Sequence, residues 1–323
     1  MLKRKQSSLQ DCNFQPQDQP KQKKRRIHQQ DLPLHPSLQA IVLDCVITAQ
    51  FLCDFEERDD DNPVTSEEEH DLCWLAKVGS RCKRLKQDLL NLVPWFCRDG
   101  LLQLVKSIHH HCGLTRKRIR GENNMALRLS CEHGQLEVVK YLHAAFKLTV
   151  DDARGKDNEC LHEACYNGHF YSVEYLCKNF GLTADDIRSR NNFALRVNCS
   201  LRITQYLCER YHLTVDDIRS HGGSVLQNAL AADMELVKYL HKTFHLTADD
   251  ARHDSDWALK SACIDDRVEA VQYLIEEFGV PEEALYHSRQ NGSALQLAID
   301  HGPSVLQYLV SRFGKQILDK IEK

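Results

Sequence analysis

A leucine recurs at a nearly constant interval through the last two-thirds of the chain, and this repeat constrains the fold more than any other feature. A Tyr-Leu pair follows it in every unit with the same period of about 33 residues. A degenerate unit precedes them, because Leu114-Thr115 lies 34 residues before Leu148-Thr149. The leucines are Leu127, Leu161, Leu195, Leu226, Leu259 and Leu295. Such a period is typical of stacked helical repeats, so we predict an all-α solenoid of about seven helix-turn-helix units.

Each unit contains a short helical stretch, a turn that glycine often marks, a second helical stretch and a linker of about a dozen residues. The unit at 157–180, "DNECLHEACYNGHFYSVEYLCKNF", resembles the ankyrin pattern x-T-P-L-H-x-A-A-x-x-G-H-x-x-V-V-x-x-L, but Glu159-Cys160 replaces its Thr-Pro pair. The resemblance covers residues 93–323. It implies an ankyrin-repeat array ending in a short capping segment, "GKQILDKIEK", and a protein that binds proteins. The spelling is also similar to ankyrin repeats of amoebae and their large DNA viruses, which implies a host–virus role.

The linkers carry the motif T-x-D-D-x-[IA]-R, as in "LTADDIR" from Leu182. Threonine followed three residues later by Asp predicts a capped helical turn rather than a carboxylate site. We expect Asp185 and Arg188 to pair along this turn, and the motif arginines to form a ladder with aspartates of adjacent linkers. The first linker, "LTRKRIR", replaces the acids, so Arg116, Lys117 and Arg118 form a basic finger that we expect to contact an acidic partner.

Two further positions describe the interior. A cysteine follows the unit leucine by four residues at Cys131, Cys165, Cys199 and Cys263, which predicts a compact buried site between helices. The third unit is short, with 11 residues from Leu195 to Tyr206, and lacks the glycine turn. We therefore expect its first helix to be cut or its turn tightened, and the junction to lower cooperativity.

The partner surface is expected on the concave side, at positions one and five after the unit leucine. A mixture of charged and aromatic side chains at these positions suits a protein partner. No nucleophile–base pair or phosphate-binding loop appears at a matching spacing, so we expect neither enzyme activity nor a cofactor. "HHHC" at His109–Cys112 leaves zinc open as a minor alternative. The expected contact residues are Arg128, Glu132, His162, Tyr166, Arg196, Lys260 and Ile264.

The N-terminal part falls into two segments. Residues 1–31 form a basic tail that we expect to be disordered, and its "PKQKKRR" resembles a nuclear localisation signal read by an importin. Residues 32–92 contain an acidic loop, 54–71. Leu32-Pro33, Leu72, Val78 and Trp95 fall roughly on a known pattern, although an insertion of about 20 residues splits it. On these residues the chain resembles a diverged F-box over 32–96, which implies docking to Skp1 of a cullin ubiquitin ligase; a helical cap on the repeats is the alternative. The signal residues are Lys21, Lys23, Lys24, Arg25 and Arg26.

Composition narrows the setting. The formal net charge is only −4, so binding of nucleic acid by the whole chain is not expected. The N-terminus lacks the apolar region of a signal peptide, and the apolar run from Leu38 to Cys53 is too short to span a membrane. The cysteines fit no disulfide framework, which is typical of a reducing compartment. We expect an intracellular protein of the nucleus or cytoplasm.

Overall fold

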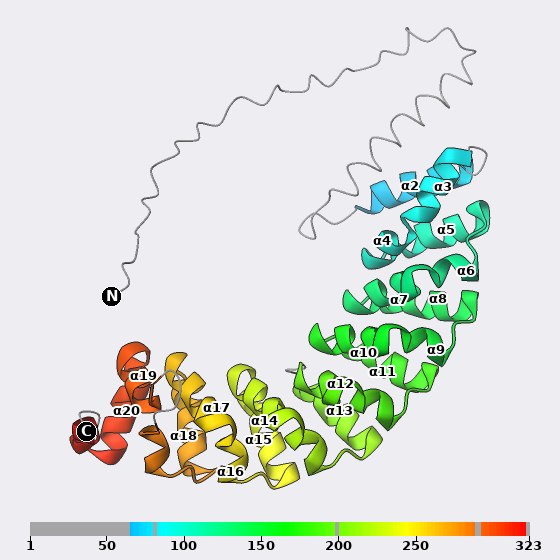
Figure 1. The fold of residues 1–323 in the computed structure, drawn as a ribbon. Coiled ribbons are helices and arrows are strands. Elements are labelled where there is room, and N and C mark those ends of the chain that lie inside the picture. Colours follow the sequence, from blue (N-terminus) through cyan, green and yellow to red (C-terminus); the bar gives the residue numbers. More distant parts are fainter. Residues whose placement is uncertain (1–64, 80–82, 198–199, 288–291, 321–323) are drawn as a thin grey trace, which may run out of the picture. The chain divides into compact units, whose positions relative to one another are not determined.

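A computed structural model describes residues 65–79, 83–197, 200–287 and 292–320. All of these belong to one compact unit, Arg58–Lys323 (Figure 1). The predicted basic tail and the N-terminal half of the F-box-like segment lie outside the described residues.

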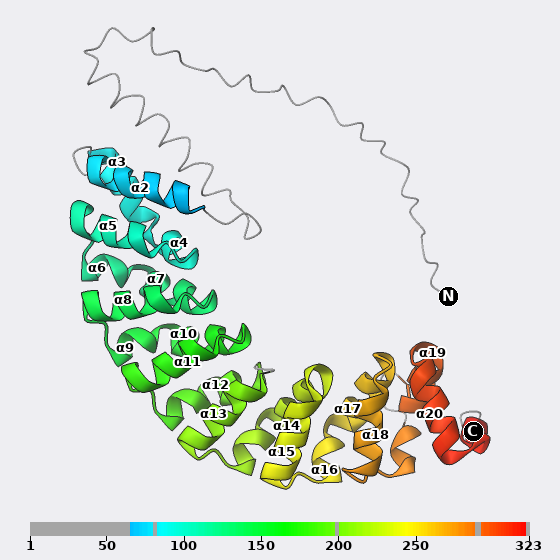
Figure 2. The same cartoon turned by 180° about the vertical axis from the view of Figure 1, so that it is seen from behind.

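The described part is helical throughout and contains no strand. In both views the first helices of the units form one row and the second helices another (Figures 1 and 2). The first helices are α4 (Val93–Arg98), α7 (Gly121–Glu132), α10 (Gly155–Tyr166), α12 (Ala184–Arg196), α14 (Val215–Ala232), α17 (His253–Ile264) and α19 (Ala294–His301). Each of them packs on the next one in this order. The predicted all-α solenoid of about seven units is confirmed.

The second row consists of helices that, except for the last, are followed by a linker. Its members are α5 (Leu102–Cys112), α8 (Leu136–Phe146), α11 (Phe170–Tyr175) with the π-helical turn η2 (Leu176–Phe180), α13 (Leu201–Tyr211), α15 (Met234–Phe244), α18 (Val268–Glu276) and α20 (Pro303–Phe313). Linker turns are α6 (Arg116–Ile119), α9 (Val150–Ala153), α16 (Ala248–Ala251) and the 3-10 turn η3 (Glu282–Leu285), while α12 and α14 include their linker turns. A 3-10 segment, η4 (Lys315–Lys320), follows α20.

The repeating leucine and cysteine positions form the core. Each unit leucine is at most 2% exposed: Leu127 is 0% exposed and Leu259 is 2% exposed. Cys97, Cys131, Cys165 and Cys263 are fully buried, which confirms the predicted core position for the described cysteines. Burial raises the pKa of the Cys97 thiol to about 12, so it remains protonated and unreactive. Cys199 lies outside the described residues.

The linker motif forms the predicted capped turn. In the third unit, the Thr183 amide and hydroxyl donate to Asp186 at 2.8 and 3.0 Å, and the same capping box occurs at Thr149, Thr214 and Thr247. The second aspartate of the motif therefore satisfies the helix start. One acid of each pair is structural.

The motif arginine pairs onward rather than within its own turn. Arg188 donates two hydrogen bonds to Asp217 of the next linker, at 2.7 and 3.0 Å. The expected pairing of Arg188 with Asp185 is therefore wrong, because the guanidinium reaches the next unit instead, whereas the predicted ladder is confirmed. Its other members are Arg120–Asp152, Arg154–Asp186 and Arg219–Asp250. Arg252 leaves the ladder and pairs with Asp256, since the following linker has no T-x-D-D motif.

Between linker turn and first helix the chain makes a left-handed turn of three residues. In the second unit these are Lys156, Asp157 and Asn158, with φ of 52°, 59° and 64°. Asn, Asp and Gly tolerate this region best, and the third unit accordingly has Arg190, Asn191 and Asn192. No pattern in the sequence predicted this turn.

The third unit is shortened as its spacing predicts. Its α12 ends at Arg196, one residue after the unit leucine, whereas α10 continues to Tyr166, five residues after Leu161. The first helix is therefore cut by about one turn.

Two helices, α2 and α3, precede the degenerate unit formed by α4 and α5. α2 (Ser66–Gly79) packs on α5, with Glu69 accepting from the Gln103 amide at 3.0 Å and Ser107 donating to the Cys73 carbonyl at 3.1 Å. α3 (Lys83–Asn91) follows and contacts α4 and α5. Leu72 and Ala76 are fully covered. The two helices cover the end of the second-helix row.

Candidate partner-binding surface

Residues one position after the unit leucine face the neighbouring repeat and not solvent. His162 is 0% exposed and Lys260 is 2% exposed, so the prediction that they contact a partner is corrected. His162 Nε2 lies 3.1 Å from Ser189 Oγ of the next unit, and its ring packs against Phe193. Burial, and then the positive charge of Arg190, lowers the pKa of His162 to about 4.

The two arginines at this position clamp the left-handed turns. Arg196 Nε donates to the Asn191 carbonyl at 2.9 Å, and its Nη2 donates to the Arg190 carbonyl at 3.1 Å. Arg128 donates in the same way to the Asn123 carbonyl at 3.1 Å, and it pairs with Glu159 at 2.8 Å. Both are half-buried. Because their N–H donors are engaged in these bonds, the two guanidinium groups stabilise the left-handed turns.

Residues five positions after the unit leucine do reach the surface. Tyr166 is 66% exposed and Ile264 is 38% exposed, while Glu132 is half-buried. These three of the predicted contact residues are accessible at the turn end of the first-helix row.

A second group of side chains, which sequence reasoning missed, flanks the same turn as Tyr166. The Arg202 guanidinium lies 3.7 Å from the Phe170 ring centroid and 4.9 Å from that of Tyr171. Tyr171 is 59% exposed. We call Tyr166, Phe170, Tyr171 and Arg202 the aromatic patch. The signal in the sequence was "HFYS", which puts two adjacent aromatics after a glycine turn in one unit only.

The shortened third unit explains why Tyr166 is uncovered. First helices stack residue against equivalent residue, and the position in α12 that would lie beside Tyr166 comes after the helix has ended. Asn228 of α14 donates to the Arg196 carbonyl, at 2.6 Å, and so satisfies one carbonyl at the truncated end. Tyr166 therefore has no helical residue of α12 at the equivalent position beside it, and its ring is 66% exposed.

The second-helix row carries a ladder of histidines and tyrosines. His143 Nδ1 lies 3.0 Å from the Tyr175 hydroxyl, and its ring stacks on Phe180 at 4.1 Å. His109–Tyr141 and His241–Tyr273 repeat the pair at 2.8 and 3.1 Å. Burial lowers the pKa of His143. His109 of the "HHHC" stretch thus serves this ladder, and among the described residues no group of three or more His, Cys, Asp or Glu is arranged to hold a metal ion.

The basic finger forms α6, near the N-terminal end of the array (Figure 1). Arg116 and Lys117 are exposed, and Arg118 bridges to the preceding helix by donating to the Leu90 carbonyl at 3.1 Å and to the Asn91 side chain. Arg118 also borders a cavity of about 280 Å³ whose walls include Leu90, Val93 and Leu114. The predicted finger is therefore partly structural and partly free at its tip.

A known protein family matches part of this array. Residues 95–191 match the family model of ankyrin repeats in three copies, so this segment consists of ankyrin repeats. The units that follow have the same helix pair and linker. Residues 95–191 are thus ankyrin repeats, and such repeats are generally protein–protein interaction modules.

Two other comparisons add little. An ankyrin repeat family protein from Legionella pneumophila aligns over 77% of this chain and 80% of its own, at 16% identity and a TM-score of 0.37. No curated protein matches the sequence. In the described ranges, no helix is both long and apolar enough to cross a bilayer.

Proposed function

We propose that the chain is a non-enzymatic scaffold or inhibitor that binds a protein partner on the face formed by its first helices and their turns. The observation that carries the proposal is the aromatic patch, where the exposed Tyr171 lies beside the Arg202 guanidinium and the exposed Tyr166 flanks the same turn. Tyrosine and arginine supply a large share of binding energy at protein interfaces.

Substitution of the patch tests this function. Tyr166→Ser together with Tyr171→Ser removes both rings at positions that the core does not use, so the melting temperature stays near that of the parent protein. We expect partners that co-purify with the tagged parent chain to be lost from the double variant. Tyr175→Phe, which changes a ladder tyrosine on the second row, is the matched control and keeps them. Retention of every partner by the double variant would remove the patch from the proposal.

Docking to Skp1 through residues 32–96 is a weaker candidate function. Two of the residues in this segment, Leu72 and Ala76, are buried on α5, which supports the role of a cap for the described part. Co-purification with Skp1 that depends on this segment would restore the candidate.

Nuclear import by an importin rests on Lys21, Lys23, Lys24, Arg25 and Arg26, outside the described residues. A fluorescent reporter fused to residues 1–30 tests it. Accumulation in the nucleus supports the proposal, and a reporter that stays in the cytosol contradicts it.

A further inference from the structure

Charge is distributed very unevenly along the array. Residues 83–120 carry nine Lys and Arg against two Asp, for a net charge of +7, whereas residues 121–323 carry a net charge of −8 from 22 basic and 30 acidic residues. The basic stretch comprises α3, α4, α5 and α6, and α6 contains the basic finger. We call its exposed members on α3 and α6, namely Lys83, Arg84, Arg116 and Lys117, the basic rim. None of Lys83, Arg84 and Lys117 has an ion pair among the described residues.

α3 and α6 are close in space. Arg118 of α6 donates to the Leu90 carbonyl at 3.1 Å at the end of α3. Burial raises the pKa of the Cys112 thiol, just before the finger, and the positive charge of the nearby Lys86 of α3 opposes this rise. The basic rim therefore spans both sides of this contact and attracts anionic groups from solution.

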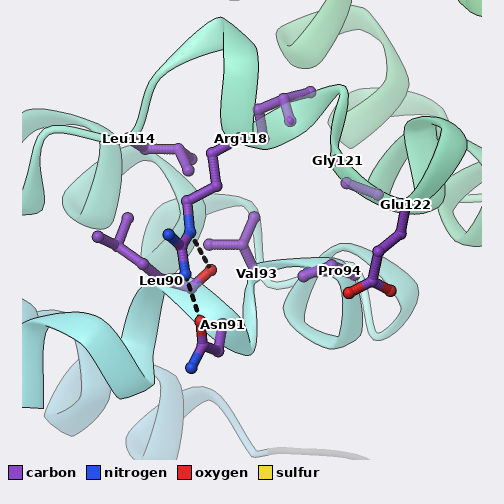
Figure 3. Close-up of a pocket in the computed structure, with 10 residues that line it drawn as sticks. Leu90, Asn91, Val93, Pro94, Leu114, Arg118, Gly121 and Glu122 are labelled. Atoms are coloured by element: carbon purple, nitrogen blue, oxygen red, sulfur yellow. Dashed lines mark hydrogen bonds between the residues drawn. The ribbon is translucent and has the colours of Figure 1, made fainter.

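The cavity of about 280 Å³ lies beside this contact. Its walls combine apolar residues such as Val93, Ile119 and Ala126, each 1% exposed, with the polar Arg118 and Glu122. Arg118 stands on one side and Glu122 on the other (Figure 3). A hollow of this size and polarity admits one large apolar side chain.

The cavity has a structural cause. Residues 88–90, one repeat period before the left-handed turn at 122–124, belong to α3 and have no positive φ. In later repeats the left-handed turn contacts the next unit, since Arg190 donates to the Lys156 carbonyl at 2.7 Å. At the cavity this turn is missing, and its place beside Gly121 and Glu122 stays empty.

We propose that this cavity and the basic rim bind an acidic peptide segment that inserts one large apolar side chain between α3–α4 and α6–α7. The proposal deepens the proposed function by naming a second contact region and its partner chemistry, and so rests on it. The apolar side chain occupies the place of the missing turn, and flanking carboxylates lie against Lys83, Arg84 and Lys117.

A peptide fits these groups better than a nucleic acid does. The Arg118 guanidinium is engaged with Leu90 and Asn91, and Arg120 is engaged with Asp152, so neither is free to grip a phosphate in a bidentate way. Among the described residues that line the cavity, none has an aromatic ring to stack on a base.

Fluorescence anisotropy of the full chain with labelled probes tests the site. The probes are a short peptide of glutamates around one central leucine, the same peptide with serine in place of leucine, the same peptide with glutamines in place of glutamates, and an oligothymidylate of similar length. We expect the Glu/Leu peptide to bind at least about tenfold more tightly than the serine and glutamine versions, because burial of a leucine and pairing of charges both contribute. The oligothymidylate should bind most weakly.

Two variants separate the contribution of the cavity to binding from that of the basic rim. Gly121→Leu adds a side chain where a Cβ meets no atom within 4 Å, so it fills the cavity without a clash. It should weaken the leucine peptide about tenfold and leave the serine peptide unchanged. Lys83→Glu with Lys117→Glu should weaken both, while Lys242→Glu on α15 is the charge control.

The contradicting results are distinct. Equal affinity for leucine and serine peptides, or no binding of any peptide, would overturn the proposal. Tighter binding of the oligothymidylate would replace it with a general polyanion site. Because Gly121→Leu is remote from Tyr166, loss of peptide binding in a variant that still captures partners through the aromatic patch separates this site from the proposed function.

Discussion

Asp217 acts in two repeats at once. It accepts from the Thr214 amide at 2.8 Å to start α14, and it binds the Arg188 guanidinium of the preceding unit at 2.7 Å. Hydrogen bonds from Arg188 lower the pKa of this carboxyl, against burial, which raises it. The carboxylate is therefore more stable in the folded protein than in the unfolded chain.

Asp217→Asn should lower the free energy of unfolding by about 1–2 kcal/mol, because the capping acceptor and the charged partner of Arg188 are both weakened. Chemical denaturation followed by circular dichroism measures it. The matched control is Asp216→Asn, whose parent side chain is exposed, with an expected loss under about 0.5 kcal/mol. Equal losses in the two variants would contradict the assignment of the structural acid.

His162 makes the array sensitive to mild acid. Its pKa falls from 6.5 to about 4 in the folded protein, so the unfolded chain binds more protons as the pH drops below 6.5. Stability is therefore full above that value and is lost as the pH falls toward 4, amounting to about 2 kcal/mol by pH 5. His162→Gln should flatten the decline of the melting temperature between pH 7 and pH 5. Replacement of the exposed His221 by Gln should not, and equal slopes in both would contradict the account.

At the scale of the element, the shortened α12 separates units that are otherwise continuous. Only one helical turn, 193–196, follows its left-handed turn, so the third unit offers little first-helix area to its neighbours. In solenoids stability is the sum of unit and nearest-neighbour terms. The weakest of these junctions limits how far unfolding spreads.

Tryptophans on the two sides report this junction. Trp95 lies before it and Trp257 after it. We expect two fluorescence midpoints in urea, one for a variant that keeps only Trp74 and Trp95 and another for a variant that keeps only Trp257. Coincident midpoints together with one calorimetric transition would show that the shortened unit does not divide the array.

Some of this element structure was readable from sequence and some was not. Spacing predicted the repeats, the cut first helix and the buried cysteines, because each depends on the local helical period. The left-handed turns were not predicted, since three consecutive positive φ angles have no simple periodic signal. His162 and Lys260 were misplaced because burial at that position depends on the neighbouring turn, which Arg128 and Arg196 clamp.

At the scale of the whole molecule, regular repeats form the frame of the array. Both proposed binding surfaces lie where a repeat is irregular. The aromatic patch arises where the third unit is short, and the cavity arises where the left-handed turn is missing from α3. Sequence reasoning predicted Tyr166 and the basic finger, because they occupy positions that the repeat register identifies. It did not predict Phe170, Tyr171, Arg202 or the cavity, which depend on how neighbouring units pack.

We propose that the surface around Tyr166, beside the end of α12, binds a specific protein. Incorporation of a photo-crosslinking phenylalanine analogue at Tyr166, in cells that express the full chain, tests it most directly, with the same analogue at Lys242 on the second row as control. The account predicts that Tyr166 yields one recurrent protein adduct, that Lys242 does not yield it, and that Tyr171→Ser abolishes it. Identical adducts from both positions, or an adduct at Tyr166 that survives Tyr171→Ser, would contradict the claim.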